Sequence, residues 1–143
     1  MAIKYDIKTA SLKRKCKKCF EKISHIFGVE AFSQFVGFKE DGDLDNIAAY
    51  FTNDGLGYPA GYVVVKNDNI QEWTIQHELA HALENSAFGD GFEDGSAKVL
   101  DMLGEKPKRE AEYIKAECLA DYIADNIDDE KITEVAKCLN EAI

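Results

Sequence analysis

Two histidines four residues apart, inside an apolar stretch that reads as a helix, constrain this chain more than any other feature. They lie in the segment His77-Glu78-Leu79-Ala80-His81, and the whole chain has three histidines. Residues four apart share one face of a helix, so two imidazoles in this arrangement can bind one divalent metal ion. The carboxylate of Glu78 can reach a water molecule on such a metal. The segment therefore predicts a metal-binding helix over residues 70–86.

A second acidic segment, 36 residues after His81, supplies candidates for the rest of a metal site. Glu117 lies among apolar residues in a stretch that reads as a helix over 108–126, and a carboxylate in such surroundings needs a partner. A catalytic zinc ion takes three protein ligands and leaves one position for water, so Glu117 would complete a set with His77 and His81. Asp121, one turn later, is predicted to accept the spare ring N–H of a liganding histidine. The alternative is a solvated acidic face.

The two motifs together, His77-Glu78-x-x-His81 and Glu117-x-x-x-Asp121, resemble those of the gluzincin metallopeptidases. More narrowly, they resemble the ImmA/IrrE-type metallopeptidases and the minigluzincins. In the ImmA/IrrE type a short apolar strand precedes the metal helix, as Tyr62-Val63-Val64-Val65 does here. The resemblance covers about residues 60–126 and departs from the ImmA/IrrE pattern at three positions, Ala80, Asp121 and Ile123. It implies a zincin-like fold, a Zn²⁺ cofactor and a peptidase in which Glu78 is the general base.

The predicted function is therefore Zn²⁺-dependent hydrolysis of peptide bonds in a polypeptide substrate, by a regulatory or latent endopeptidase that works with a regulatory protein partner. In this hypothesis Glu78 takes a proton from metal-activated water and passes it to the leaving amine. Tyr113, one turn before Glu117, is a candidate second donor to the oxyanion, against the alternative of ordinary packing. The substrate is expected to add as a strand to an exposed sheet edge formed by Gly61, Tyr62, Val63 and Val64.

The competing interpretation is a partner-dependent or catalytically silent zinc-binding module that acts through a basic N-terminal helix. The net charge of −10 conceals a basic beginning, because residues 1–22 hold eight of the seventeen Lys and Arg residues and only two acidic ones. The basic residues predict a solvated lysine face on a helix over 9–27. A contact with the acidic remainder of the chain and binding to nucleic acid are the alternatives, and the second is the less favoured.

Composition limits the class of protein further. A chain of 143 residues is of the size of one domain with a single hydrophobic core, here assigned to 1–143. It contains no run of eighteen apolar residues, so no membrane contact is expected. The beginning of the chain lacks the apolar stretch of a secretory signal, and four scattered cysteines do not make a disulfide scaffold. These features predict a cytoplasmic protein.

Hydrophobic periodicity predicts an α+β fold. After the basic helix, three stretches read as strands, at 31–39, 46–53 and 61–66. Helices are expected for the remainder: the metal helix, a short helix that begins with Ser96 as its N-cap and ends at Gly104, the helix over 108–126, and a last helix to about 142. Strands followed mainly by helices favour a small, mostly antiparallel three-stranded sheet that packs on the metal helix.

Overall fold

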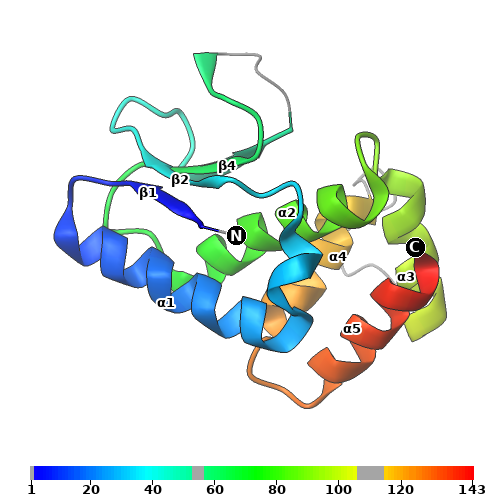
Figure 1. The fold of residues 1–143 in the computed structure, drawn as a ribbon. Helices are drawn as coiled ribbons and strands as arrows, with labels where there is room; N and C mark the ends of the chain where they lie inside the picture. Colours follow the sequence, from blue (N-terminus) through cyan, green and yellow to red (C-terminus); the bar gives the residue numbers. More distant parts are fainter. Residues whose placement is uncertain (1, 53–56, 106–114) are drawn as a thin grey trace.

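The computed structural model describes residues 2–52, 57–105 and 115–143, and these residues form an α+β arrangement (Figure 1). Their elements follow one another as β1 (Lys4–Asp6), α1 (Ala10–Phe27), the 3₁₀ helix η1 (Val29–Phe32), β2 (Gly37–Glu40), β3 (Ala48–Phe51), β4 (Tyr62–Val65), α2 (Glu72–Phe88), α3 (Glu93–Leu103), α4 (Lys115–Asp125) and α5 (Lys131–Ala142). The prediction of an α+β fold is thus confirmed, while the detail of the sheet differs.

The sheet has four strands in the order β1-β2-β4-β3, so the expected three-stranded, mostly antiparallel sheet is wrong. β1 pairs parallel to β2 and β2 pairs parallel to β4, whereas β3 pairs antiparallel to β4. β1 has three residues, too few for a periodic pattern, and this is why the sequence did not reveal it. The strand expected over 31–39 is shorter than predicted. The first residues of that range belong to η1, and the strand begins only at Gly37.

β4 lies inside the sheet, between β2 and β3, and this corrects the prediction that Gly61, Tyr62, Val63 and Val64 form an exposed edge. Residues 63–65 are fully buried. A continuous β-branched run of this kind is typical of a strand that is covered on both faces. The two edges of the sheet are β1 and β3.

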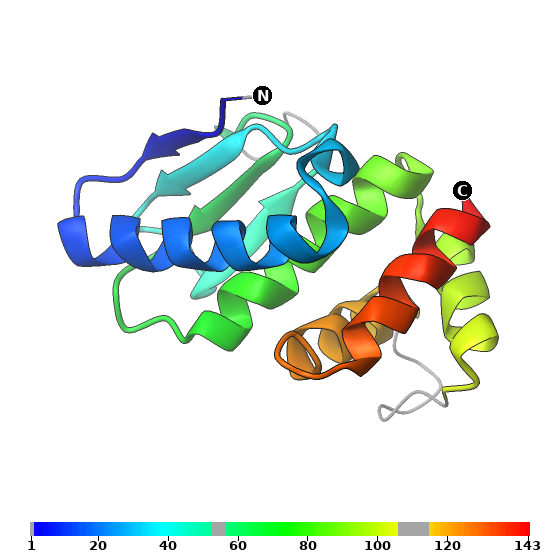
Figure 2. The ribbon, with the colours of Figure 1, turned by 60° about the horizontal axis from the view of Figure 1, so that its bottom comes forward.

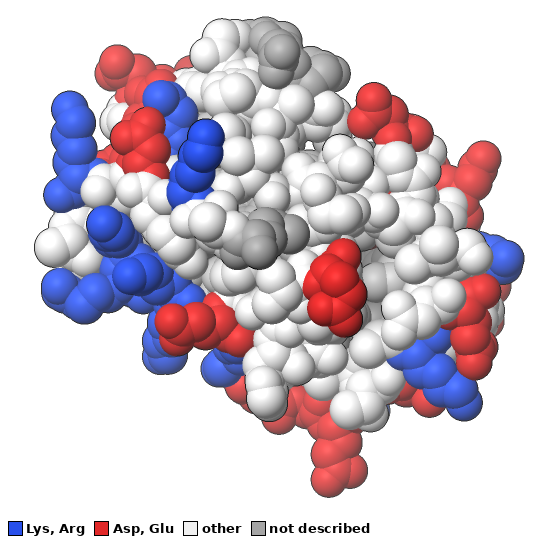
Figure 3. All heavy atoms as spheres, viewed as in Figure 1, with Lys and Arg blue, Asp and Glu red and all other residues white. Residues whose placement is uncertain are grey.

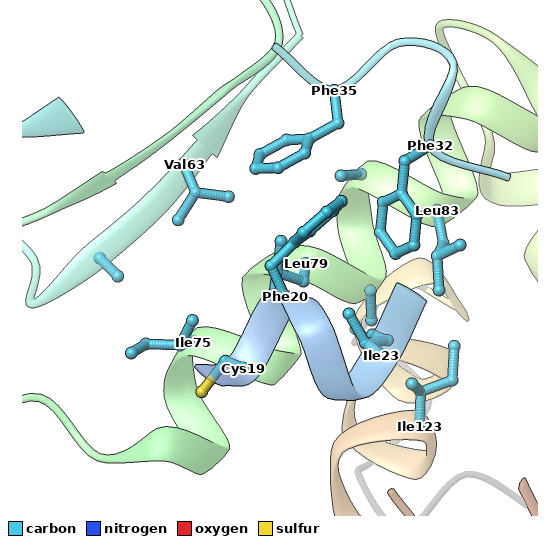
Figure 4. Packing of buried hydrophobic residues seen from close by; sticks show 14 of the residues in the cluster. Cys19, Phe20, Ile23, Phe32, Phe35, Val63, Ile75, Leu79, Leu83 and Ile123 are labelled. Carbon is cyan, nitrogen blue, oxygen red and sulfur yellow. The ribbon is translucent and has the colours of Figure 1, made fainter. Parts of the chain in front are cut away.

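The main core lies between the sheet and the two helices α1 and α2, which cover one of its faces (Figure 2). Leu12, Cys16, Cys19, Phe20 and Ile23 form the buried face of α1. The Phe20 ring packs against Phe32 and Phe35 with centroids 5.1 and 5.4 Å apart (Figure 4). These aromatic contacts hold α1 and the turn after it against the sheet, and they provide the rigid layer on which α2 lies.

α2 is buried on most of its surface, because it lies between the sheet and the C-terminal helices. Leu79, Ala80, Ala82 and Leu83 are all fully buried, and buried residues that face several directions are typical of a helix in such a central position. Its bounds, Glu72–Phe88, are shifted by two residues from the predicted range 70–86. Several polar side chains of α2 are therefore buried too, among them His77, His81 and Glu84.

Among the C-terminal helices, α3 packs on both α4 and α5, and α4 packs closely on α2 (Figure 1). α3 begins at Glu93, so Ser96 lies inside the helix and is not its N-cap as predicted. The close approach of α3 to α2 requires a glycine at position 95, where a Cβ atom would lie 2.3 Å from the Phe88 ring. In the described parts of the chain, no helix is both long and apolar enough to cross a membrane.

The basic residues of α1 form a cluster on one side of the surface, at the left in Figure 3. Two of them contact acidic side chains of the rest of the chain: Lys18 Nζ lies 3.0 Å from Glu72 and Lys22 Nζ 2.8 Å from Asp128. Lys15 donates to the backbone carbonyl oxygens of residues 68 and 70. The helix therefore contacts the acidic remainder of the chain, which was one of the predicted alternatives, and it also has exposed lysines.

Candidate metal centre

Two neighbouring helices bring the three predicted metal ligands together. His77 and His81 project from α2, and Glu117 projects from the first turn described for α4, which packs against α2. Nε2 of His77 lies 3.2 Å from Oε2 of Glu117, and Nε2 of His81 lies 2.7 Å from Oε1 of the same residue. Both histidines are buried and Glu117 is one-third exposed. The helical spacing and the helix packing together thus produce a cluster with one partly open side.

The geometry of this cluster fits a divalent metal ion. Ligand atoms at about 2.0–2.2 Å from a tetrahedral zinc ion stand roughly 3.3–3.5 Å from one another. The 3.2 Å separation between His77 and Glu117 is close to that range, the 2.7 Å separation between His81 and Glu117 is shorter, and one donor atom from each residue lies within 4.8 Å of the others. Two imidazoles with one carboxylate form a ligand set of the catalytic type, which leaves a coordination position for another molecule.

The electrostatics of the donors agree with a site for a cation. Hydrogen bonds from His77 and His81 hold the pKa of Glu117 well below its usual range. Burial of His81 disfavours its charged form, but hydrogen bonds with Glu117 and Glu84 outweigh burial and raise the pKa of His81 to about 10. The carboxylates around His81 thus favour positive charge at this place, and a divalent cation can supply that charge in exchange for the proton.

Each imidazole contacts a second carboxylate through its other nitrogen. Nδ1 of His77 lies 2.9 Å from Oδ1 of Asp121, the contact that the sequence led us to expect, although the two atoms are not aligned as in a good hydrogen bond. Nδ1 of His81 makes a well-formed hydrogen bond of 2.8 Å with Oε1 of Glu84. Carboxylates in these positions fix the tautomer and the orientation of metal-binding histidines.

Glu84 is a site residue that the sequence analysis missed. Its side chain is fully buried, burial raises its pKa to about 7, and Oε2 accepts a short hydrogen bond from the hydroxyl of Ser96 on α3. The available signal was an acidic residue three positions after His81 in the metal helix. Three residues along a helix is close to one turn, which places the carboxylate beside the imidazole.

Glu78, the predicted general base, lies at the border between α2 and the edge strand β3. Oε2 of Glu78 is 4.0 Å from Nε2 of His77, and Oε1 accepts a hydrogen bond of 3.0 Å from the backbone N–H of Tyr50. Burial raises the pKa of Glu78, and the two histidines oppose that effect only in part. A carboxylate with a raised pKa beside the metal ligands suits a group that accepts and returns a proton.

An aromatic ring lies beside each of the two histidines. The Trp73 ring stacks on His77 with centroids 5.3 Å apart, and its Nε1–H donates a 2.8 Å hydrogen bond to Asp125. Phe92 lies beside His81, with centroids 6.1 Å apart. These rings limit the rotation of the imidazoles and shield them from water.

The start of the described part of α4 is held by α3. The carboxylate of Glu93 accepts hydrogen bonds from the backbone N–H groups of Lys115 and Ala116, the second at 2.9 Å. These bonds fix the turn that carries Glu117. Tyr113, the candidate oxyanion donor, lies outside the described residues.

Comparison with known proteins gave no match: no family model, no curated protein and no solved structure matches this chain. The chemistry of the centre therefore has to be inferred from its own residues and their geometry.

Proposed function

We propose that this protein is a zinc-dependent endopeptidase of the gluzincin type, with His77, His81 and Glu117 as metal ligands and Glu78 as general base. One observation carries the proposal: the three donor atoms converge from two helices at a place where the partly buried Glu78 lies beside them. Such a glutamate has no task in a purely structural metal site. The resemblance of the two motifs to those of gluzincins supports the same assignment.

The sheet edge beside Glu78 supports a polypeptide as the substrate. The carbonyl oxygens of Ile47 and Phe51 accept hydrogen bonds from the backbone of the β4 side, so these alternate residues of the β3 segment face β4. In an antiparallel pair, residues that hydrogen-bond to the partner strand alternate with residues whose backbone groups point away from it. Tyr50 is of the second kind, and its N–H points toward Glu78. A polypeptide that added to β3 as a further strand would therefore lie beside the general base. This edge replaces the one predicted at Gly61 to Val64.

The residues of the chain would divide the work as follows. Zn²⁺, when bound, would supply Lewis acidity that lowers the pKa of water and polarises a carbonyl group. Glu78 would hold the proton released from water and return it to the leaving amine, and its buried position keeps that proton from bulk solvent. Asp121 would keep the imidazole of His77 oriented. The partly exposed side of Glu117 leaves room for the scissile bond.

The variant Glu78→Gln tests this proposal. It removes the base and keeps the size of the side chain, so we expect full zinc binding and a loss of at least about 100-fold in the cleavage of an unfolded, fluorescently labelled polypeptide. Zinc content is measured by mass spectrometry of the metal. Glu72→Gln, on the first turn of the same helix, is the matched control and should cleave normally. A Glu78→Gln protein that cleaves at the wild-type rate would disprove the role of Glu78, and a wild-type protein that binds no zinc would disprove the proposal as a whole.

A further inference from the structure

Glu84 is a fully buried carboxylate that the hydrolytic chemistry does not use directly. We propose that Glu84, held by Ser96, is a positioning residue that fixes His81 for metal binding, so that α3 forms part of the metal centre although it supplies no ligand. The inference rests on the metal centre of the proposed function and goes beyond it by assigning roles to two residues outside both motifs.

The contacts of His81 give the first argument. Its Nε2 faces Glu117 at 2.7 Å and its Nδ1 faces Glu84 at 2.8 Å, so the two ring nitrogens are directed to opposite sides. A carboxylate acceptor on Nδ1 requires the proton to be on that nitrogen, and the lone pair of Nε2 is then directed to the metal position. Glu84 thus selects the tautomer in which His81 can act as a ligand through Nε2.

The burial of Glu84 gives the second argument. A buried carboxylate is costly to maintain, and an apolar side chain of similar size at the same place is often at least as favourable for stability. Glu84 has no exposed surface and lies on a helix whose neighbouring positions are filled by apolar residues such as Leu83. Both of its oxygens are nevertheless hydrogen-bonded, one to His81 and the other to Ser96. The core itself does not need this arrangement, whereas a fixed imidazole does.

The third argument comes from α3, which braces both parts of the ligand set. Ser96 is fully buried and holds Glu84, and Glu93, three residues earlier on the same helix, accepts the N–H groups of Lys115 and Ala116. One face of α3 therefore contacts the network behind His81 and also the turn of α4 that carries Glu117. The position of α3 consequently determines how the two helices that supply ligands face each other.

Zinc affinity and the tautomer of His81 test the inference. Zinc dissociation constants are measured by competition with a chelator, and the tautomer is measured by two-dimensional ¹H–¹⁵N spectroscopy of the imidazoles. We expect Glu84→Ala to weaken zinc binding by about 10- to 100-fold and to change the tautomer populations of His81. Glu84→Gln keeps an acceptor for Nδ1–H without the charge, so it should keep the tautomer and lose less affinity. Glu72→Gln is the control and should match the wild type in both measurements.

The variant Ser96→Ala provides a second test in case the Glu84→Ala protein does not fold. It removes only one hydroxyl group, and we expect it to weaken zinc binding in the same direction as Glu84→Ala, with circular dichroism showing the native helix content. Wild-type zinc affinity in both Glu84→Gln and Ser96→Ala would overturn the inference, as would wild-type zinc affinity with an unchanged His81 tautomer in a folded Glu84→Ala protein. A wild-type protein that binds zinc and cleaves no polypeptide would instead count against the proposed function alone, because these measurements do not depend on cleavage.

Discussion

The backbone N–H of Tyr50 donates a hydrogen bond of 3.0 Å to Oε1 of Glu78, and its phenol hydroxyl donates one of 2.8 Å to Asn85. Glu78 and Asn85 lie seven residues apart on α2, about two helical turns. One residue of the edge strand β3 therefore contacts α2 at two levels. The consequence is that the position of the candidate base depends on the sheet edge where a substrate strand would bind.

The backbone contact with Glu78 can be tested by Tyr50→Pro, with Tyr50→Ala as its control. Both variants remove the phenol, but only proline removes the N–H, and at an edge position this N–H is not part of the sheet ladder. A hydrogen bond to a charged group contributes about 1.5–3 kcal/mol, so we expect Tyr50→Pro to cleave roughly 10- to 100-fold more slowly than Tyr50→Ala. Zinc affinity should be the same in both variants, and equal cleavage rates would exclude a role of this bond.

The metal should link the stability of the fold to the ligand set. Zinc at 100 times its dissociation constant is expected to raise the free energy of unfolding by about 2.7 kcal/mol, since it binds the folded chain alone. Urea unfolding with and without zinc measures this increment. Glu117→Ala should lose most of it, because α4 then contributes no donor, whereas the exposed Glu141→Ala should retain it. An increment that survives Glu117→Ala would mean that the ion binds elsewhere.

The contact between α3 and α2 predicts that Gly95→Ala destabilises the protein, although alanine normally favours a helix over glycine. A Cβ atom at this position would lie 2.3–2.5 Å from atoms of the Phe88 ring, and such overpacking typically reduces the free energy of unfolding by about 1–3 kcal/mol. Phe88→Ala should relieve the clash in a double-mutant cycle. Gly42→Ala, with no atom within 4 Å of the new carbon, should change stability by less than about 0.5 kcal/mol. A wild-type stability of Gly95→Ala would show that α3 adapts.

Glu40 should make stability depend on pH at acidic values. Its carboxylate accepts the backbone N–H of Lys8 at 2.9 Å, and from Thr9 it accepts the N–H at 2.9 Å and the hydroxyl at 2.7 Å. These bonds, above all those from Thr9, lower the pKa of Glu40. Its contribution is therefore present above its unfolded pKa of about 4.3 and is lost as the pH falls through the folded value.

The variant Glu40→Gln measures that contribution. The difference in free energy of unfolding between wild type and variant should be largest near neutral pH and should shrink as the pH falls below the unfolded pKa of about 4.3 and through the lower folded pKa. Chemical denaturation at several pH values gives this curve. A difference that does not vary over this range would show that Glu40 acts through its shape alone.

The sequence was sufficient for those features that depend on local periodicity. α1, α2 and α5 follow from apolar residues at steps of three and four, and the convergence of His77, His81 and Glu117 follows from two motifs on helices. Helical spacing fixes the distance within each motif. The packing of the two helices, which brings the third donor to the first two, was inferred by analogy with a known arrangement and could not be calculated from either segment.

The features that sequence analysis missed depend on pairing between distant segments. β1 is too short for a pattern, and its parallel pairing with β2 arises only once α1 has crossed between them. β4 is an inner strand because it pairs with β2 on one side and with β3 on the other, and this leaves β3 at the edge. Glu84 has the residue type of a solvated position, and only the docking of α3 shows that it is buried. The hydrogen bond to Glu78 comes from the backbone N–H of Tyr50. Because the side chain takes no part in this bond, the identity of the residue gives no sign of it.

The division of the ligand set between α2 and α4 has a consequence for biosynthesis. Translation supplies the sheet, both imidazoles and the proton acceptor first, whereas the last donor emerges from the ribosome 36 residues after His81. Under the proposed function, a growing chain would therefore carry both imidazoles and the base before Glu117 is made, and peptide cleavage would begin only when the C-terminal helices have assembled.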